Sequence, residues 1–368
     1  MTILVVLAMV LVPVDFSYGQ ALVAPGQATV SVRTVEWLRD HGAGPLVNTV
    51  ENWWYARNRP VGTAPDPTSL PSVAGPGAPV GARPAALPLT GAARLPGEAV
   101  WVPSAQRVGG SPPVYTAYFR PDPQSPSVVA GVAWMNQSLV QTRLIAGTTD
   151  PAPAGSATTV DNAGAQVPLG LRSALLATFN SGFKLKDSRG GFYTNGREVQ
   201  PLQPDAASLA IDTSGRVDIG RWGRDLKLTA RTAAVRQNLA LVVDGGGPVR
   251  GLDTNTTYSW GSANNQLQYT WRSSLGLDAT GNLVYLAADQ LSLADLARAM
   301  TAARVVRGME LDIHPQTVTF LSYRPGQATT AAVGTPLLPS MRAVTDRYLR
   351  PDQRDFLAVS ARPAPTGP

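Results

Sequence analysis

The stretch Gly308-Met309-Glu310-Leu311-Asp312-Ile313-His314-Pro315 reads as one short strand with two different faces. Side chains alternate along a strand, so Met309, Leu311 and Ile313 point one way, toward a core. Glu310, Asp312 and His314 project from the other face, with successive Cα atoms roughly 6.5–7 Å apart. Two carboxylates and an imidazole at this spacing can shift each other's pKa and divide acid and base roles. The stretch therefore predicts Glu310, Asp312 and His314 as catalytic residues; the plainer interpretation is an edge strand whose polar face meets water.

A helix is predicted just before this strand, over Ser292 to Val305. Ser292 and Asp295 form a capping box, and an apolar stripe runs through the segment at helical spacing. Arg304 suits the C-terminal end of the helix, and Gly308 is expected to terminate it. The chain thus passes from a helix directly into the polar-faced strand.

Composition narrows the possible classes of protein. With 368 residues, of which 44% are apolar and 15% charged, the chain can bury a sizeable core. The 35 glycines and 32 prolines favour many short strands and turns. Cysteine is absent, which excludes disulfides, thiolate metal sites and cysteine nucleophiles. The net charge of +6 comes from scattered arginines, so nucleic acid is not an expected partner.

The chain divides into five segments by composition: 1–20, 21–59, 60–97, 98–361 and 362–368. The apolar run Ile3 to Val14 in the first segment is shorter than a membrane span needs, and it indicates a signal peptide or an N-terminal membrane anchor. A helical, envelope-proximal segment follows, then a Pro/Gly/Ala-rich linker, a globular domain and a short tail. We therefore expect an extracytoplasmic protein, secreted or held at the cell membrane by its N-terminal segment.

Glycine-rich turns follow a predicted strand at Leu175 to Phe179. Asn180 and Gly182 come at its end, and Asn195-Gly196 follows after Gly190-Gly191. Such glycines allow the backbone to approach a ligand closely, and the two asparagine amides can bind sugar hydroxyls or phosphate. For Asn195 the simpler interpretation is a type I′ hairpin turn.

A second candidate loop is Asp244-Gly245-Gly246-Gly247, which follows the apolar strand Leu239 to Val243. Its backbone amides could cradle a phosphate, although a strained turn explains the pattern equally well. Trp260, Tyr269 and Trp271 place aromatic rings near Arg272, a composition that suits a sugar-binding cleft but also ordinary core packing.

The order of these motifs resembles the phosphodiester glycosidase family, whose domain occurs in N-acetylglucosamine-1-phosphodiester α-N-acetylglucosaminidase, the uncovering enzyme. The resemblance covers roughly residues 170–325. It is carried by Asn180-Ser181-Gly182-Phe183, Gly191-Phe192-Tyr193 with Asn195-Gly196, the similar hairpins at Asp212 and Asp278, Arg272 leading into Leu275-Gly276, and Leu311-Asp312 after the Ser292 helix. It implies an α+β fold, with a mixed β-sheet and few helices, and hydrolysis of a sugar 1-phosphodiester.

One motif departs from the family pattern. Where the family has Asp-Gly-Gly-Gly-Ser, this chain has Asp312-Ile313-His314-Pro315-Gln316. Either His314 supplies chemistry that the glycine loop supplies elsewhere, or this branch acts on a different substrate or is inactive.

Two functional hypotheses follow. The first is an exported or envelope-anchored hydrolase in which His314 is the general acid or base. Asp312 and Glu310 are then its partners or ligands of a divalent metal ion, Arg272 clamps phosphate, and Asn180, Gly182, Asn195, Asp244, Gly245 and Gly246 line the substrate site. The second is a catalytically inactive glycan-binding or cell-envelope module. No other cofactor is expected.

Overall fold

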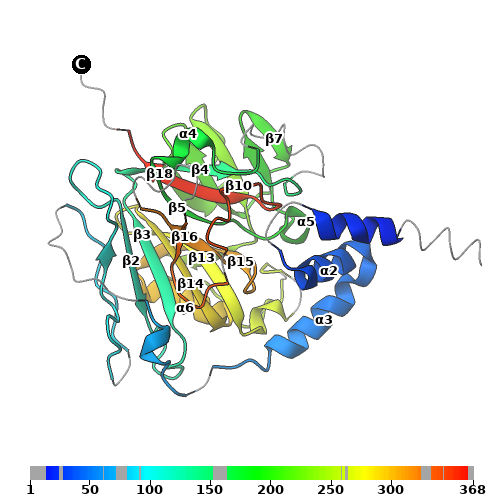
Figure 1. The fold of residues 1–368 in the computed structure, drawn as a ribbon, viewed down its shortest axis with the longest axis horizontal. Coiled ribbons are helices and arrows are strands. Elements are labelled where there is room, and N and C mark those ends of the chain that lie inside the picture. The colour runs from blue at the N-terminus through cyan, green and yellow to red at the C-terminus, as the bar shows by residue number, and fades with distance from the viewer. Residues whose placement is uncertain are drawn as a thin grey trace, which may run out of the picture.

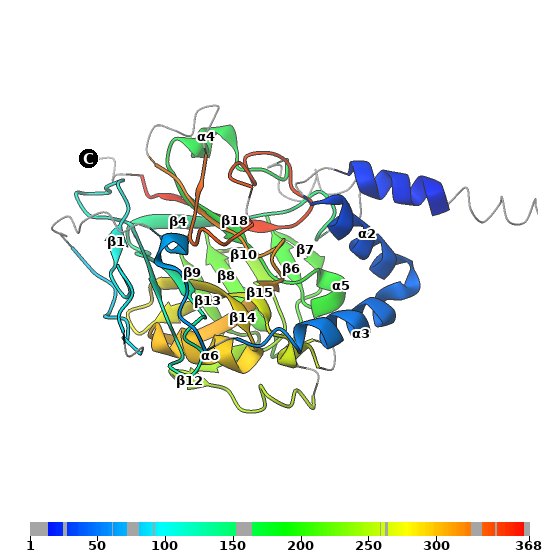
Figure 2. The same ribbon diagram turned by 60° about the horizontal axis from the view of Figure 1, so that its bottom comes forward.

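A computed structural model describes residues 14–24, 28–60, 62–71, 81–90, 93–151, 164–257, 259–261, 264–324, 333–342 and 344–363. Most of the chain forms a β-rich globe with few helices, and three helical segments lie against one side of it (Figures 1 and 2). The α+β class is confirmed. The family resemblance implied a mixed sheet, whereas every ladder between named strands of the described residues is antiparallel.

The largest sheet has eight strands in the order β1-β2-β3-β14-β13-β15-β11-β12. Their bounds are β1 (Val102–Pro103), β2 (Val114–Phe119), β3 (Ala130–Met135), β14 (Leu283–Leu291), β13 (Thr270–Asp278), β15 (Val305–Ile313), β11 (Leu241–Asp244) and β12 (Gly247–Pro248). The strand with the predicted polar face is β15. It lies between β13 and β11, so it is an interior strand and its polar side chains do not form a solvated edge.

Two five-stranded sheets complete the globe. One has the order β7-β6-β10-β8-β9, and the other β17-β16-β5-β18-β4. Their bounds are β4 (Val140–Ile145), β5 (Leu175–Asn180), β6 (Phe192–Thr194), β7 (Arg197–Gln200), β8 (Ala207–Asp212), β9 (Val217–Arg221), β10 (Thr232–Gln237), β16 (Phe320–Ser322), β17 (Thr335–Pro336) and β18 (Phe356–Ala361).

Helix α6 (Leu293–Ala302) covers one face of the eight-stranded sheet (Figure 1). Its N-terminus has the predicted capping box between Ser292 and Asp295. The helix ends three residues earlier than the sequence predicted, because Arg304 takes a left-handed conformation (φ +67°) and turns the chain into β15. Gly308 therefore lies within β15, where a Cβ atom would come 2.3 Å from the Cε atom of Met300. Glycine at this position lets strand and helix pack closely.

A second core lies between the sheets, on the other face of β13, β14 and β15. Phe179 of β5 and Phe320 of β16 stack with ring centroids 5.9 Å apart, and Tyr285 of β14 packs on both rings. Leu311 and Met309 of β15 face the same core, as the alternation of the strand predicted, whereas Ile313, expected on the same face, is buried but does not belong to this core. This packing fixes the C-terminal end of β15 relative to β5 and the turn that follows it.

Outside residues 14–60, the described helices other than α6 are short. They are α4 (Leu169–Arg172), α5 (Leu185–Ser188), η2 (Pro67–Ser69) and η4 (Asn265–Leu267). The chain just before β1 departs from the expected spacer: Leu87 and Leu95 are buried in the globe, and the Trp101 indole donates to the Ala85 carbonyl over 2.9 Å. The second half of the proline-rich segment therefore packs on the globe.

Residues 28–60, called here the N-terminal arm, contain the other helices: α2 (Val30–Leu38), η1 (Arg39–Ala43) and α3 (Gly44–Tyr55). Thr29 caps α2 through its hydroxyl, and Gly42 (φ +92°) breaks the helix between α2 and α3. Residues 14–23 are helical as well. In the described part of the chain, no helix combines the length and the hydrophobicity needed to cross a bilayer. Most of the apolar run Ile3 to Val14 lies outside the described residues.

Candidate active site

Asp312 lies at the C-terminal end of β15 and faces a cavity between the globe and the N-terminal arm. Its Oδ1 accepts from the Ile313 amide (2.9 Å), and its Oδ2 lies 3.1 Å from the Arg354 guanidinium. The residue is 7% exposed. Burial raises the pKa of the Asp312 carboxyl, and the cation of Arg354 only partly offsets this effect. A raised pKa makes a carboxyl group a better proton acceptor and lets it hold a proton at a higher pH than an exposed aspartate.

His314 follows two residues later and also lines the cavity. Its backbone leaves the strand conformation (φ +81°), so strict alternation does not place its side chain. The imidazole Nδ1 lies 3.2 Å from the Thr270 hydroxyl, and the ring stacks on Tyr55 of α3 with centroids 5.1 Å apart. Burial, together with the charges of Arg39 and Arg272, lowers the pKa of His314 to about 3. The ring is therefore neutral and a weak base, and its unprotonated nitrogen can accept a hydrogen bond.

Glu310 does not share the cavity with Asp312 and His314. It is 1% exposed and pairs through Oε1 with the Arg272 guanidinium, while the pKa of its carboxyl is raised by burial against the opposing effect of Arg272. The catalytic face predicted from alternation therefore reduces to two residues. Because β15 is an interior strand, its neighbour β13 supplies Arg272 as the counter-ion of Glu310, the third predicted residue.

Arg272 has a structural position. Its side chain is fully buried, and besides Glu310 it donates to three backbone carbonyls: Leu291 O (2.8 Å), Asn265 O (2.6 Å) and Gln268 O (3.2 Å). All its nitrogens are used within the fold, so none is available for a substrate phosphate. This corrects the role expected for Arg272.

Two other cationic side chains, Arg354 and Lys184, line the cavity. Arg354, just before β18, contacts Asp312 and donates to the Gly182 carbonyl over 2.8 Å. Lys184 follows the turn that begins at Asn180. Burial and the neighbouring charges of Arg354 and Lys186 lower the pKa of Lys184 to about 7, and the carboxylates of Asp187 and Asp312 work against this shift. The Lys184 side chain also contacts the Glu36 carboxylate of the arm. Sequence reasoning missed both residues; the only signal was that Lys184 directly follows the glycine-rich turn.

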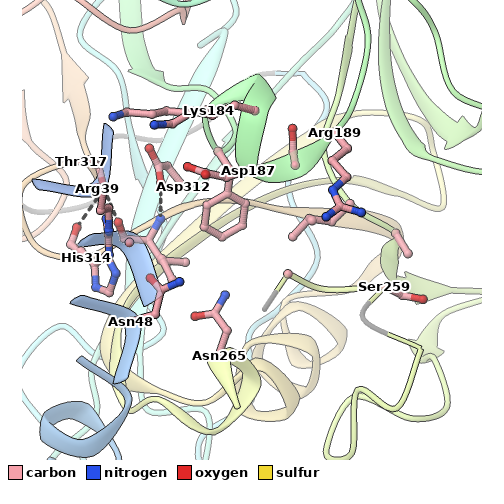
Figure 3. A pocket seen from close by; sticks show the side chains of 18 of the residues that line it. Arg39, Asn48, Lys184, Asp187, Arg189, Ser259, Asn265, Asp312, His314 and Thr317 are labelled. Carbon is pink, nitrogen blue, oxygen red and sulfur yellow. Dashed lines mark hydrogen bonds between the residues drawn. The ribbon is translucent and has the colours of Figure 1, made fainter. Parts of the chain in front are cut away.

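The cavity has a volume of about 1010 Å³. The globe contributes α5, the end of β15 and the segment around η4, and the arm contributes its polar side chains (Figure 3). Arm residues in its wall are Glu36, Arg39, Gly44, Asn48 and Glu51. This volume is sufficient for a glycosyl phosphodiester, since small-molecule sites usually span about 300–1,000 Å³.

The arm is held over the cavity by polar contacts. Glu36 and Asp40 pair with Lys184 and Lys186 of the globe, and Glu51 Oε2 lies 3.8 Å from His314 Nε2. The Gln268 amide donates to Asn52 over 2.6 Å, and the Tyr269 amide donates to the Tyr55 carbonyl over 3.1 Å. The arm therefore covers Asp312, His314 and Lys184 together.

The remaining predicted binding residues lie elsewhere or serve the fold. Asn180 is buried, and its amide bonds Ser273, the Ser181 carbonyl, Tyr285 and the Thr319 amide. Gly182 lies behind the cavity, where a Cβ atom would come 2.7 Å from the Asn238 side chain. Asn195 (φ +51°) and Gly196 (φ +75°) form the turn between β6 and β7, as the hairpin interpretation predicted.

Asp244, Gly245 and Gly246 are at the opposite end of β15 from Asp312. The Asp244 carboxylate pairs with Arg307 at 3.0 Å, and Arg307 lies five residues before Asp312, a separation of roughly 16 Å along a strand. The glycine loop therefore does not belong to this cavity, which corrects its assignment to the same substrate site.

A divalent metal ion fits these residues poorly. Glu310 and Asp312 are each paired with an arginine, and within the described ranges no three His, Asp or Glu side chains gather as ligands.

Comparison with protein-family models agrees with the motif order. No curated protein matches. Among solved structures, the catalytic domain of zebrafish N-acetylglucosamine-1-phosphodiester alpha-N-acetylglucosaminidase, described as auto-inhibited by its pro-peptide, is 12% identical with a TM-score of 0.43 (72% of this chain, 88% of that chain). A hypothetical protein from Synechocystis is 13% identical with a TM-score of 0.39 (70% and 64%). Residues 173–312, which include both Lys184 and Asp312, match the family model of the phosphodiester glycosidases.

Proposed function

We propose that this domain hydrolyses a sugar 1-phosphodiester or a related glycan linkage. The observation that carries the proposal is the cavity in which Asp312, His314, Lys184 and Arg354 meet, within or beside the segment that matches the phosphodiester glycosidase family. Water adds to the anomeric carbon, the bond from that carbon to the phosphate oxygen breaks, and the proton lost by water balances the proton gained by the departing phosphate.

Asp312 is the proposed acid–base residue. Its raised pKa lets it donate a proton to the departing oxygen or take one from water. His314, neutral and 3.2 Å from Thr270, would orient the attacking water or a sugar hydroxyl through hydrogen bonds.

Lys184 and Arg354 would bind the phosphate. In the structure the Lys184 ammonium contacts the Glu36 carboxylate of the arm, and a substrate phosphate would take the place of that carboxylate. Arg354 adds a second positive charge next to Asp312. The site thus brings two cations to the bond that Asp312 would help to break.

Because the arm covers these residues, the proposed activity is latent until the arm moves. Export is part of the proposal too: the apolar run Ile3 to Val14 and the proline-rich segment after the arm support a location outside the cytoplasm.

The test is hydrolysis of a chromogenic sugar 1-phosphodiester by the full chain. In the variant Glu36→Lys/Asp40→Lys, the carboxylates that face Lys184 and Lys186 become cations, so the arm should be released. Faster limited proteolysis within residues 28–60 verifies the release. We expect turnover to rise in this variant, and adding Asp312→Asn to it should lower turnover by about 100-fold or more.

Asp253→Asn is the matched control, because Asp253 is exposed and lies outside the cavity wall. A released, folded variant without turnover would favour the inactive glycan-binding module. Turnover that is insensitive to Asp312→Asn would instead refute the acid–base role of Asp312.

A further inference from the structure

Exposed apolar side chains are concentrated in the N-terminal helices. Among the residues that the structure describes, fifteen large apolar side chains are exposed, and nine of them lie between Val14 and Trp54. Isolated exposed apolar residues are ordinary, but a concentration of this kind marks an interaction surface.

In α3 the exposed apolar residues form a single stripe. Leu46, Val50, Trp53 and Trp54 are spaced by four, three and one residues, so they lie on one face of the helix, and their exposed fractions are 67%, 55%, 55% and 63%. We call this stripe the outer face of α3.

The opposite face of α3 is the one in contact with the globe. Asn48 and Glu51 line the cavity, Asn52 accepts from Gln268, and Tyr55 stacks on His314. The helix is therefore amphipathic in the unusual sense: its polar face is turned toward the protein and its apolar face toward solvent. Packing against the globe cannot explain the outer face, because the globe uses the other side.

Charge is also divided between the two sides. The three acidic residues of α2, η1 and α3 are Glu36, Asp40 and Glu51, and each pairs with a cation of the arm or the globe. At the end of the outer face, Arg57 is exposed and its guanidinium lies 4.2 Å from the centre of the Trp53 ring. Arg59 is also exposed, but its guanidinium lies over the Tyr269 ring of the globe. The outer face thus combines tryptophans with the positive charge of Arg57, while Glu51, the acid of α3, lies on the opposite face and pairs with Arg39.

We infer that the outer face of α3 docks on an anionic membrane surface. Tryptophan beside arginine suits the boundary between headgroups and acyl chains, where the indole is half buried and the guanidinium meets lipid phosphate. The helix over residues 14–23 also exposes apolar side chains, Phe16 (68%) and Val23 (82%), and it follows the apolar run Ile3 to Val14 in the sequence. Pairing with a second copy is less suitable, because a symmetric dimer through this stripe would bring the arginines of the two copies together.

This inference is independent of the proposed catalysis, and the test uses no substrate. Since the chain has no cysteine, Val50→Cys gives the 368-residue chain a single thiol on the outer face for an environment-sensitive fluorophore. Leu228→Cys is the matched control, an equally apolar position that is 49% exposed and lies in the globe. Each labelled protein is mixed with vesicles of phosphatidylcholine alone or with one quarter phosphatidylglycerol.

We expect a blue-shifted emission from position 50 with the anionic vesicles, quenching by brominated acyl chains, and neither effect at position 228. Adding Trp53→Ser/Trp54→Ser should weaken vesicle partition by about tenfold or more and abolish the shift at position 50. Both tryptophans are exposed, so thermal unfolding should be unchanged.

Three results would overturn the inference. The first is vesicle-bound protein whose probe at position 50 remains in water, since the apolar N-terminus alone would then hold the protein. The second is a shift without vesicles together with a doubled mass in solution, which would assign the outer face to a second copy. The third is no vesicle binding at all.

Discussion

Replacing Arg272 with methionine leaves the Glu310 carboxylate inside the core without its cation. The two side chains are 0% and 1% exposed, and Glu310 Oε2 already lacks a hydrogen-bond partner among the described residues. The substitution also removes the donors to Leu291 O, Asn265 O and Gln268 O. Removing one partner of a buried ion pair typically costs about 3–5 kcal/mol.

The size of this effect separates a structural role from a phosphate-binding role. A loss of about 3–5 kcal/mol corresponds to a fall in Tm of about 6–20 °C for a domain of this size. Because burial already raises the pKa of Glu310, the carboxyl without Arg272 should take up a proton in the folded state. A folded-state pKa above the unfolded value stabilises most at low pH, so Arg272→Met should be least destabilised near pH 4 and most destabilised above neutrality.

Urea unfolding followed by tryptophan fluorescence measures the effect in three variants: Arg272→Met, Glu310→Leu and the two together. The double variant leaves no buried charge, so it should lose less stability than the sum of the single variants. If Arg272→Met unfolds within about 1 kcal/mol of the wild type and instead loses affinity for a phosphodiester, Arg272 is a phosphate ligand and the buried-pair argument is wrong.

Two further predictions concern the surroundings of the cavity. Gly182→Ala should lower the free energy of unfolding in urea by about 1–3 kcal/mol, because the new methyl group meets the Asn238 side chain. It should also lower turnover in the arm-released variant, because it displaces the turn that carries Lys184. Unchanged stability would mean that the turn adapts freely. His314, neutral beside Glu51, Arg39 and Tyr55, has a folded pKa of about 3 against 6.5 unfolded, so its contribution to stability is present above pH 6.5 and is lost as the pH falls toward 3. Asp312 and Glu310, with raised pKa values, change the pH dependence of stability in the opposite direction. The effect of His314 is therefore measured as the free energy of unfolding of the wild type minus that of His314→Gln, at pH 7.5 and at pH 4.5. An equal difference at the two pH values would contradict this account.

The sequence predicted the elements in which local pattern decides the structure. The capping box of Ser292 and Asp295, the core-facing residues Met309 and Leu311 of β15, and the turn at Asn195 all lie as expected. Each depends on neighbours within a few residues, where helical and strand periodicity carry the information.

The partners of the site residues could not be read in this way. Arg354 is 42 residues beyond Asp312 in sequence and meets it only because β18 pairs with β5. The ion pair of Glu310 could not be predicted either, because a period-two pattern shows which side chains share a face but not whether another layer covers that face. Burial by β13 and the segment around η4 turned one predicted catalytic carboxylate into half of a core ion pair.

Because the arm and the domain belong to one chain, the arm has an advantage over the substrate in binding to the cavity. The arm is a ligand attached to its own receptor, and a short tether of this kind gives an effective concentration on the order of millimolar. A substrate present at micromolar concentration competes poorly with such a neighbour unless its intrinsic affinity for the site is far higher than that of the arm. A single cut in the chain after Tyr55 would turn the neighbour into a free peptide, whose concentration is only that of the protein itself. After that cut, dilution alone should increase the fraction of open sites.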